Sequence, residues 1–285
     1  MEKYLIKNVI LFKKKFPFIE EPLSNEEFEY PLAYGIIVYK SAFQVYMMMS
    51  VIYQYLSGFD LPLKTNLEMV RIFKQLNESI NIEVSLYQPH RLCKEVQNIK
   101  PPLTLWKSSM SSLFPRKAAR EMIASNKVHE LMNFLQYTVC SDETIWATVA
   151  GNPKELKISG GFNAFAFFNE RTECVKNKEK DIIINEELKL MKEKYPNETF
   201  HLNSYYISRY QVWGDSAIHK CYGKYASGSC VFGINDIPIL IKRPELVQHK
   251  MYLDYQPAAY FCLWKTIYER SLDWKKQKEF KATAY

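Results

Sequence analysis

Apolar runs and helical periodicities alternate along the chain from its first third onward. Residues 32–40, LAYGIIVYK, form a continuous apolar run that predicts a buried strand. Residues 41–56 follow with a helical pattern for which Ser41 is the expected N-cap. Because a strand that leads directly into a helix is typical of α/β proteins, we expect an α/β fold.

The middle of the chain predicts a capped helix and two short strands. The spacing Thr65-x-x-Glu68 is that of a capping box. The apolar face of the helix that follows comprises Leu67, Val70, Ile72, Phe73 and Leu76. Alternating apolar positions in 79–87 indicate a half-buried strand, with the apolar side chains of Ile80, Ile82, Val84 and Leu86. Residues 102–107 predict a second strand.

The second half of the chain again contains both helical and strand patterns. We expect helices around Pro115 and over 128–135, 184–195 and 256–272, and a helix interrupted by proline over 235–247. Strands are expected within 204–213 and 229–234, and residues 152–180 read as loop.

Residues 141–151, SDETIWATVAG, predict a short helix that ends at Gly151. Ser141 is its expected cap, and Asp142 and Glu143 fill the first turn, where the helix dipole favours acids. That placement explains both carboxylates without a function. An acid held beside Trp146 can also act as a proton acceptor, so the pattern alone leaves both interpretations open.

Composition and charge narrow the class of protein. The 285 residues are 47% hydrophobic and 24% charged, as in a globular protein with a core, and the 15% of aromatic residues suits a packed core or stacking on sugar rings. The net charge of +7 comes from scattered side chains, with Lys13–Lys15 as the only run, and nucleic-acid-binding motifs are absent. We expect no nucleic acid partner.

The apolar runs and the cysteines argue against a membrane span and a metal site in this chain. The apolar stretch near the N-terminus is broken by Lys7 and Asn8, and no run approaches the ~20 residues of a membrane span, so we expect neither an anchor nor a span in this chain. No C-x-x-C pair occurs, and the histidines are not at ligand spacing from the cysteines, so no metal site is expected. Sequons at Asn77 and Asn197 hint at the secretory pathway and at glycosylation.

Several ordered segments carry a resemblance to a known family. They are YPLAYGIIVYKSAFQV, SGFDLPLKTNLEMVRIFK, SDETIWATVAG, GKYASGSCVFGINDIPILIKRPELVQHKMYLDYQP and AAYFCL. In this order they resemble the core-2/I-branching β-1,6-N-acetylglucosaminyltransferases (glycosyltransferase family 14), and in particular divergent nematode-like members. The resemblance runs from about residue 30 to residue 271, with an irregular segment at 1–29 and a tail at 272–285.

The resemblance implies a GT-A-like glycosyltransferase domain. It would transfer N-acetylglucosamine from UDP-GlcNAc to an acceptor glycan in β-1,6 linkage, with inversion and without a metal or other cofactor, which agrees with the absence of a D-x-D motif. A Golgi membrane glycoprotein is implied. Two alternatives stay open: a catalytically dead glycan-binding protein, and a related xylosyl- or glucuronosyltransferase.

The resemblance also assigns roles to the catalytic base and to the residues that bind the donor diphosphate. Glu143 matches the family's catalytic base, with Ser141 in place of a proline. Lys250 matches a lysine that binds the donor diphosphate. Ser227 stands where the family has an arginine for the same diphosphate, which weakens the expected donor site, and Lys224 and Lys242 are candidate substitutes.

On the acceptor side, Glu83, Arg91 and Lys94 keep the family's spacing, with the two basic residue types exchanged. The alternative is that these three are solvated charges. Tyr210 is the closest match to an aromatic residue that stacks on the acceptor, while Val212 replaces a tyrosine.

Two further expectations follow from the resemblance. The family closes the loop between Cys221 and Cys230 with a disulfide, whereas Cys262 has no matching partner and is expected to be free or paired differently. Between residues 54 and 55 the family has further strand–helix units, about 60 residues at the usual size of such a unit. We therefore expect a domain that is truncated in its nucleotide-binding half.

Overall fold

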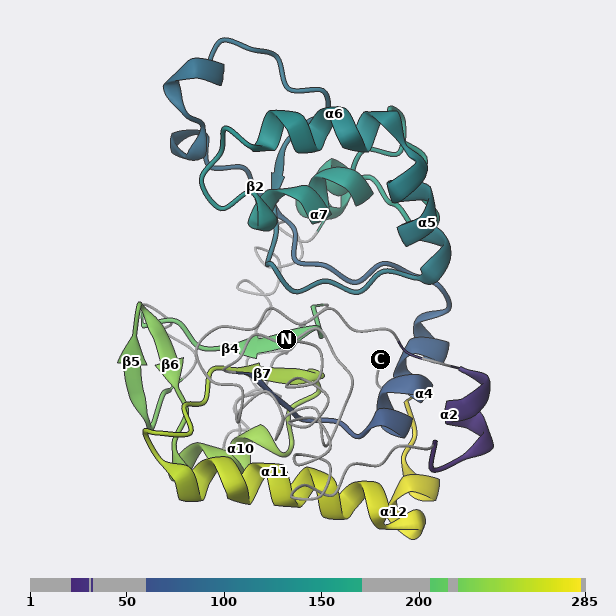
Figure 1. The fold of residues 1–285 in the computed structure, drawn as a ribbon, viewed down its shortest axis with the longest axis vertical. Helices are drawn as coiled ribbons and strands as arrows, with labels where there is room; N and C mark the ends of the chain where they lie inside the picture. Colours follow the sequence, from purple (N-terminus) through teal and green to yellow (C-terminus); the bar gives the residue numbers. More distant parts are fainter. Residues whose placement is uncertain (1–21, 31, 33–59, 171–205, 215–219, 283–285) are drawn as a thin grey trace, which may run out of the picture. The chain divides into compact units, whose positions relative to one another are not determined.

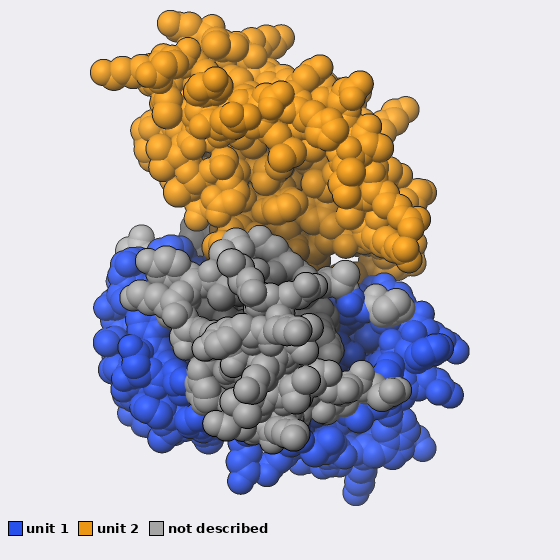
Figure 2. All heavy atoms as spheres, viewed as in Figure 1, with its two compact units in different colours: residues 1–75, 209–285 blue, residues 76–208 orange. Residues whose placement is uncertain are grey.

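A computed structural model describes residues 22–30, 32, 60–170, 206–214 and 220–282 of the chain. The predicted helices over 41–56 and 184–195, the predicted break at 54–55, and nearly all of the predicted strand 32–40 lie outside these residues. The chain divides into two compact units, Met1–Gln75 with Arg209–Tyr285 (unit 1) and Leu76–Ser208 (unit 2). Figure 2 shows the two units in different colours, and each is described by itself.

Unit 1 is built on a small mixed sheet of β1 (Asp60–Pro62), β7 (Val247–His249) and β4 (Arg209–Gln211). The central strand β7 is antiparallel to β1 and parallel to β4. The long helix α11 (Pro257–Leu272), which was predicted, packs against β1 (Figure 1). Fully buried side chains at the centre of this unit include Leu61, Leu63, Met69, Leu240 and Tyr260.

The capping box predicted in unit 1 is confirmed at the start of α4 (Asn66–Leu76). The Thr65 amide donates to Glu68 Oε2 at 2.8 Å, and the Glu68 amide donates to Thr65 Oγ1 at 3.2 Å. The predicted apolar face is partly right. Its N-terminal members are buried together with Met69, whereas Phe73 and Leu76 are half-buried.

The remaining described elements of unit 1 are short. They are α2 (Asn25–Glu29), the hairpin β5 (Lys224–Ala226) and β6 (Ser229–Val231), η3 (Ile234–Asp236), α10 (Ile237–Leu240) and α12 (Trp274–Glu279). The predicted helix over 235–247 is therefore confirmed only as far as Leu240. The rest of that range leads into β7.

Unit 2 contains a two-stranded sheet in which β2 (Ser85–Leu86) pairs antiparallel with β3 (Trp106–Lys107). Two 3₁₀ turns, η1 (Pro89–Arg91) and η2 (Lys94–Val96), lie between these strands in the sequence. The alternation predicted for 79–87 holds for Ile80, Ile82 and Val84, which are buried. It was wrong for Leu86, whose side chain is 58% exposed.

Three helices cover the core of unit 2: α5 (Arg116–Ala124), α6 (Asn126–Leu135) and α7 (Asp142–Ala150) (Figure 1). All three were predicted. Residues 164–170 are also helical, although the sequence indicated a loop. Asn163 Oδ1 accepts from the Ala166 amide at 3.1 Å at the start of this turn, and Ala164 is fully buried in the core. The described residues thus mix helices with small sheets, as the predicted α/β class requires.

Candidate active site

Glu143 lies in the first turn of α7 in unit 2, where the sequence placed it. Ser141 precedes the helix with a helical backbone and makes no side-chain capping bond, so its predicted capping role was wrong. Gly151 ends the helix, as predicted. A Cβ there would lie 2.5 Å from both the Ala147 carbonyl and the Ala164 Cβ, which explains the requirement for glycine.

Two cations hold the carboxylate of Glu143. Arg91 Nη1 lies 2.8 Å from Glu143 Oε2, and Lys107 Nζ lies 4.0 Å from the same oxygen. The side chains of Arg91, Lys107 and Glu143 are 14%, 22% and 28% exposed. The group is therefore partly shielded from water and partly exposed, and it carries one more positive than negative charge.

A short antiparallel pairing brings Arg91 to Glu143. The Val139 amide donates to the Arg91 carbonyl at 2.8 Å, and the Cys93 amide donates to the Tyr137 carbonyl at 3.0 Å. Residues 137–139 lead directly into α7, so this pairing places the end of η1 beside the first helical turn. Arg91 Nε also donates to Gln88 Oε1 at 2.6 Å, which orients the guanidinium.

Strand β3 brings Lys107 to the same carboxylate. The Trp106 amide donates to Thr148 Oγ1 at 2.9 Å, and the Ser108 amide donates to the Glu143 carbonyl at 2.6 Å. Strand and helix are therefore joined on both sides of Lys107. Lys107 was not predicted as a site residue, since its only signal in the sequence is its place at the end of the predicted strand 102–107.

The other two residues predicted for the acceptor side, Glu83 and Lys94, form no ion pair with Glu143 among the described residues. Glu83 is half-buried in the extended segment before β2, and Lys94 is exposed at the start of η2. Among the described residues, the ion pairs of Glu143 involve Arg91 and Lys107 and neither of these two. Asn77, the first predicted glycosylation position, is exposed at the end of α4, while Asn197 lies outside the described residues.

Lys250, the predicted diphosphate ligand, follows β7 in unit 1 and is 8% exposed. Its amide donates to the Cys230 carbonyl at 3.3 Å, and its carbonyl accepts from the Phe232 amide at 2.9 Å. Burial, helped by the charge of Arg209, lowers the pKa of the Lys250 ammonium, and the charge of Asp60 opposes that shift.

A histidine–carboxylate pair lies next to Lys250 in the same sheet. His249 Nδ1 lies 2.5 Å from Asp60 Oδ1, and Asp60 is 1% exposed. Burial lowers the pKa of His249, although the hydrogen bond to Asp60 raises it. Asp60, His249 and Arg209 were not predicted to meet, because they lie in three strands that are far apart in the sequence.

Ser227 lies at the exposed tip of the β5–β6 hairpin. Ser227 and Gly228 form a two-residue turn with φ of 50° and 73°, the backbone of a type I′ turn. Lys224, a candidate substitute for the family's arginine, lies 4.3 Å from the centre of the Tyr255 ring. Lys242, the other candidate, is exposed.

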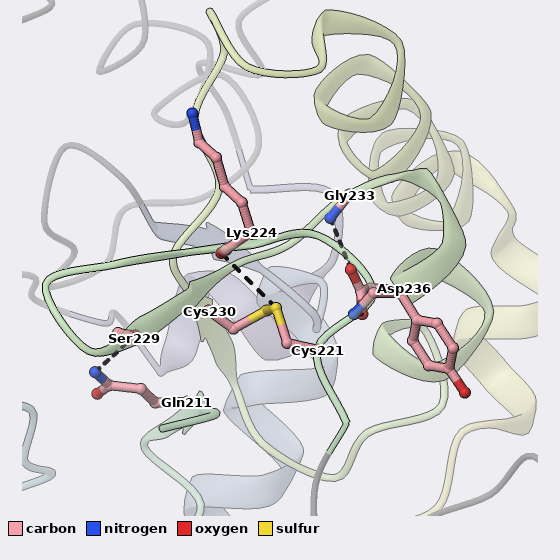
Figure 3. Close-up of a disulfide and its surroundings, with 8 residues drawn as sticks. Gln211, Cys221, Lys224, Ser229, Cys230, Gly233 and Asp236 are labelled. Atoms are coloured by element: carbon pink, nitrogen blue, oxygen red, sulfur yellow. Dashed lines mark hydrogen bonds between the residues drawn. A yellow bond between two sulfur atoms is a disulfide. The ribbon is translucent and has the colours of Figure 1, made fainter. Parts of the chain in front are cut away.

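The disulfide between Cys221 and Cys230 is present, with Cα atoms 5.7 Å apart (Figure 3). Figure 3 shows the side chain of Lys224 directed away from this bridge. Two hydrogen bonds secure the surrounding loop, from Gln211 Nε2 to Ser229 Oγ at 3.0 Å and from the Gly233 amide to Asp236 Oδ2 at 2.8 Å. The free cysteines among the described residues are Cys93, Cys140 and Cys262.

Tyr210, the predicted stacking residue, is packed inside unit 1. It is 5% exposed, its ring stacks on Phe232 with centroids 5.6 Å apart, and Arg243 lies 4.2 Å from its ring centre. The ring therefore offers little open surface, and its stacking role stays a prediction.

The described residues contain neither a membrane-spanning helix nor a cluster of metal-binding side chains. None of their helices is both long and apolar enough to cross a membrane. Nor do three or more His, Cys, Asp or Glu side chains gather there in a way that could hold a metal ion.

Comparisons with known proteins show which proteins the chain is similar to. Residues 54–192 match the model of the Core-2/I-Branching enzyme family. A human β-1,3-galactosyl-O-glycosyl-glycoprotein β-1,6-N-acetylglucosaminyltransferase is 23% identical over 239 residues, which cover 76% of this chain and 49% of the relative. A mouse N-acetyllactosaminide β-1,6-N-acetylglucosaminyl-transferase is 25% identical over 240 residues, or 76% of this chain and 50% of the relative.

A bovine relative with the same name as the human enzyme is 29% identical over 116 residues, which cover 35% of this chain and 27% of the relative. The chain thus spans about half the length of the human and mouse relatives. The chain therefore resembles the Core-2/I-Branching enzyme family over residues 54–192, and it is similar to β-1,6-N-acetylglucosaminyltransferases over most of its length.

Proposed function

We propose that this protein transfers N-acetylglucosamine from UDP-GlcNAc to a hydroxyl group of an acceptor glycan, with Glu143 as the general base. One observation supports the proposal in addition to the family match. The Glu143 carboxylate lies at the start of α7, is 28% exposed and pairs with Arg91 and Lys107. A general base must lie within hydrogen-bond reach of its substrate, and the partial exposure of this carboxylate supports that role.

The proposed reaction is a single displacement with inversion. Glu143 takes the proton of the acceptor hydroxyl as that oxygen forms a bond to C1 of the donor sugar. The bond from C1 to the diphosphate oxygen breaks at the same time, and its electron pair leaves with UDP. In β-1,6 transfer the attacking group is a primary hydroxyl. Basic side chains that include Lys250 would stabilise the departing diphosphate, so the proposed reaction needs no metal.

A transfer assay with paired carboxamide variants tests the role of Glu143. The purified protein is incubated with UDP-GlcNAc and a Gal-β1,3-GalNAc acceptor. We expect Glu143→Gln to lower kcat about 10²- to 10⁴-fold, the usual contribution of a general base. Asp142→Asn is the matched control, because Asp142 is the exposed acid next to Glu143 in the same helical turn. Full activity of Glu143→Gln would rule out the proposed role.

One observation favours a second candidate, a catalytically dead protein that binds glycans. Ser227 occupies the family's arginine position on an exposed hairpin turn, and a serine hydroxyl cannot neutralise a diphosphate. In that case calorimetry would detect binding of the acceptor glycan and no binding of UDP. Measurable UDP binding would count against this candidate.

The finer assignments belong to the same proposal. Location in the Golgi, attachment to its membrane and glycosylation at Asn77 and Asn197 are proposed from the family. A xylosyl- or glucuronosyltransferase would differ in donor choice, so competition between UDP-sugars for the UDP site distinguishes it from an N-acetylglucosaminyltransferase.

A further inference from the structure

The two oxygens of the Glu143 carboxylate have different surroundings. Both cations lie beside Oε2. The distance to this oxygen is 2.8 Å from Arg91 Nη1 and 4.0 Å from Lys107 Nζ. Within the part of the chain that the structure describes, Oε1 accepts no hydrogen bond and takes part in no ion pair. One oxygen is therefore anchored, while the other keeps its lone pairs for a ligand.

The backbone next to Lys107 strengthens this asymmetry. Ser108 is fully buried and donates two hydrogen bonds to the Glu143 carbonyl. One comes from its backbone amide at 2.6 Å and the other from its hydroxyl at 3.2 Å. Lys107 therefore reaches the carboxylate from a strand that is itself fixed to the first turn of α7. The terminal torsion of a glutamate is broad and roughly two-fold, so a free carboxylate would present either oxygen. Two cations on one side favour a single orientation.

We propose that Lys107 is a positioning residue that works with Arg91 to anchor Oε2, so that Oε1 is the atom that takes the proton from the acceptor hydroxyl. This inference rests on the proposed function of Glu143 as the base. Lys107 touches neither substrate in this scheme, and its effect passes entirely through Glu143.

A double-mutant cycle tests the proposal in the transfer assay, using Lys107→Met, Glu143→Gln and the double variant. We expect Lys107→Met to lower kcat about fivefold, the upper end of what a partly exposed ion pair delivers, with the acceptor KM unchanged. Lys107→Arg keeps the charge and should restore most of the activity. In the Glu143→Gln background, Lys107→Met should cause no further loss, because the residue through which it acts is gone.

The control is Lys127→Met, which removes an exposed lysine paired with Glu130 at 3.8 Å on α6 of the same unit and should leave kcat unchanged. Thermal unfolding of every variant shows whether a loss comes from misfolding. An equal loss from Lys107→Met in both backgrounds, or a raised acceptor KM with unchanged kcat, would overturn the positioning role.

The outcomes distinguish failure of the positioning role of Lys107 from failure of the proposed function of Glu143. Loss of transfer in Glu143→Gln with unchanged kcat in Lys107→Met overturns the positioning role and leaves the base in place. Full transfer by Glu143→Gln, or no transfer by the unaltered protein, overturns the proposed function, and the role of Lys107 falls with it.

Discussion

A buried ammonium group lies in the interior of unit 1. Lys64 is 6% exposed, and its Nζ donates to the Arg243 carbonyl at 2.5 Å. Burial lowers the pKa of Lys64 to about 8, although the nearby charge of Glu68 raises it. Desolvation therefore outweighs the attraction of the carboxylate at this position.

This pKa predicts a pH dependence of stability. The unfolded chain keeps its proton on Lys64 up to about pH 10.5, whereas the folded chain loses it near pH 8. Stability linked to Lys64 is therefore complete above pH 10.5 and is lost as the pH falls through 8. Between pH 7 and pH 10, we expect the unfolding free energy to rise by about 2 kcal/mol more in the unaltered protein than in Lys64→Met.

Denaturant unfolding at several pH values measures this difference. Lys74→Met is the control, because Lys74 is exposed on α4 and pairs with Glu26 at the surface. Its unfolding free energy should differ from that of the unaltered protein by a constant amount over the same range. A constant difference for Lys64→Met as well would contradict the lowered pKa.

At the level of elements, one hydroxyl links two helices of unit 1. Thr65 Oγ1 accepts from the Glu68 amide at the start of α4 and donates to Gln277 Oε1 of α12 at 2.8 Å. Gln277 is 2% exposed, and its side-chain Nε2 donates to the Arg270 carbonyl at 2.7 Å. The cap of α4 therefore also fixes the position of α12.

Removal of this hydroxyl should be more costly than the loss of a helix cap alone. We expect Thr65→Val to lower the unfolding free energy by about 2 kcal/mol, because the cap is lost and the buried Gln277 oxygen loses its donor. Thr65→Ser keeps the hydroxyl and should lower the unfolding free energy much less. Thr266→Val on α11 is the control, since among the described residues that hydroxyl bonds a carbonyl of its own helix and no other group. Equal effects of the valine and serine variants would show that the hydroxyl contributes little.

At the level of the whole molecule, the residues proposed for the donor diphosphate and the proposed base lie in different units. Lys250 and Ser227 belong to unit 1, and Glu143 with its two cations belongs to unit 2. Changes on the donor side should therefore alter UDP binding, while a change at Glu143 should leave UDP binding unaltered and act on transfer.

Calorimetric titration with UDP tests this division. We expect Ser227→Arg to raise UDP affinity about tenfold, because a charge-assisted hydrogen bond to the diphosphate would be gained. Lys250→Met should lower the affinity, and Glu143→Gln should leave it unchanged. Ser227→Gln is the control, since it adds length without charge. Unchanged affinity in Ser227→Arg, together with a loss in Lys250→Met, would show that position 227 does not face the diphosphate.

The sequence by itself determined the features that depend on neighbours within one helical turn. The capping box of Thr65 and Glu68, the position of Glu143 in the first turn of α7 and the stop at Gly151 all follow from such short-range interactions. Local patterns failed at Leu86 and at residues 164–170, where packing decided which side chains are buried. The order of the family motifs anticipated the Cys221–Cys230 bridge, which no local pattern does.

The tertiary structure alone decided which distant charges meet. Arg91 pairs with Glu143 across 52 residues, and Asp60 meets His249 across 189 residues. The meeting of Lys107 with Oε2 depends on the hydrogen bonds between β3 and α7. Side chains far apart in sequence meet only when strands and helices pack and bring their backbones together, and spacing along the chain carries no record of that packing.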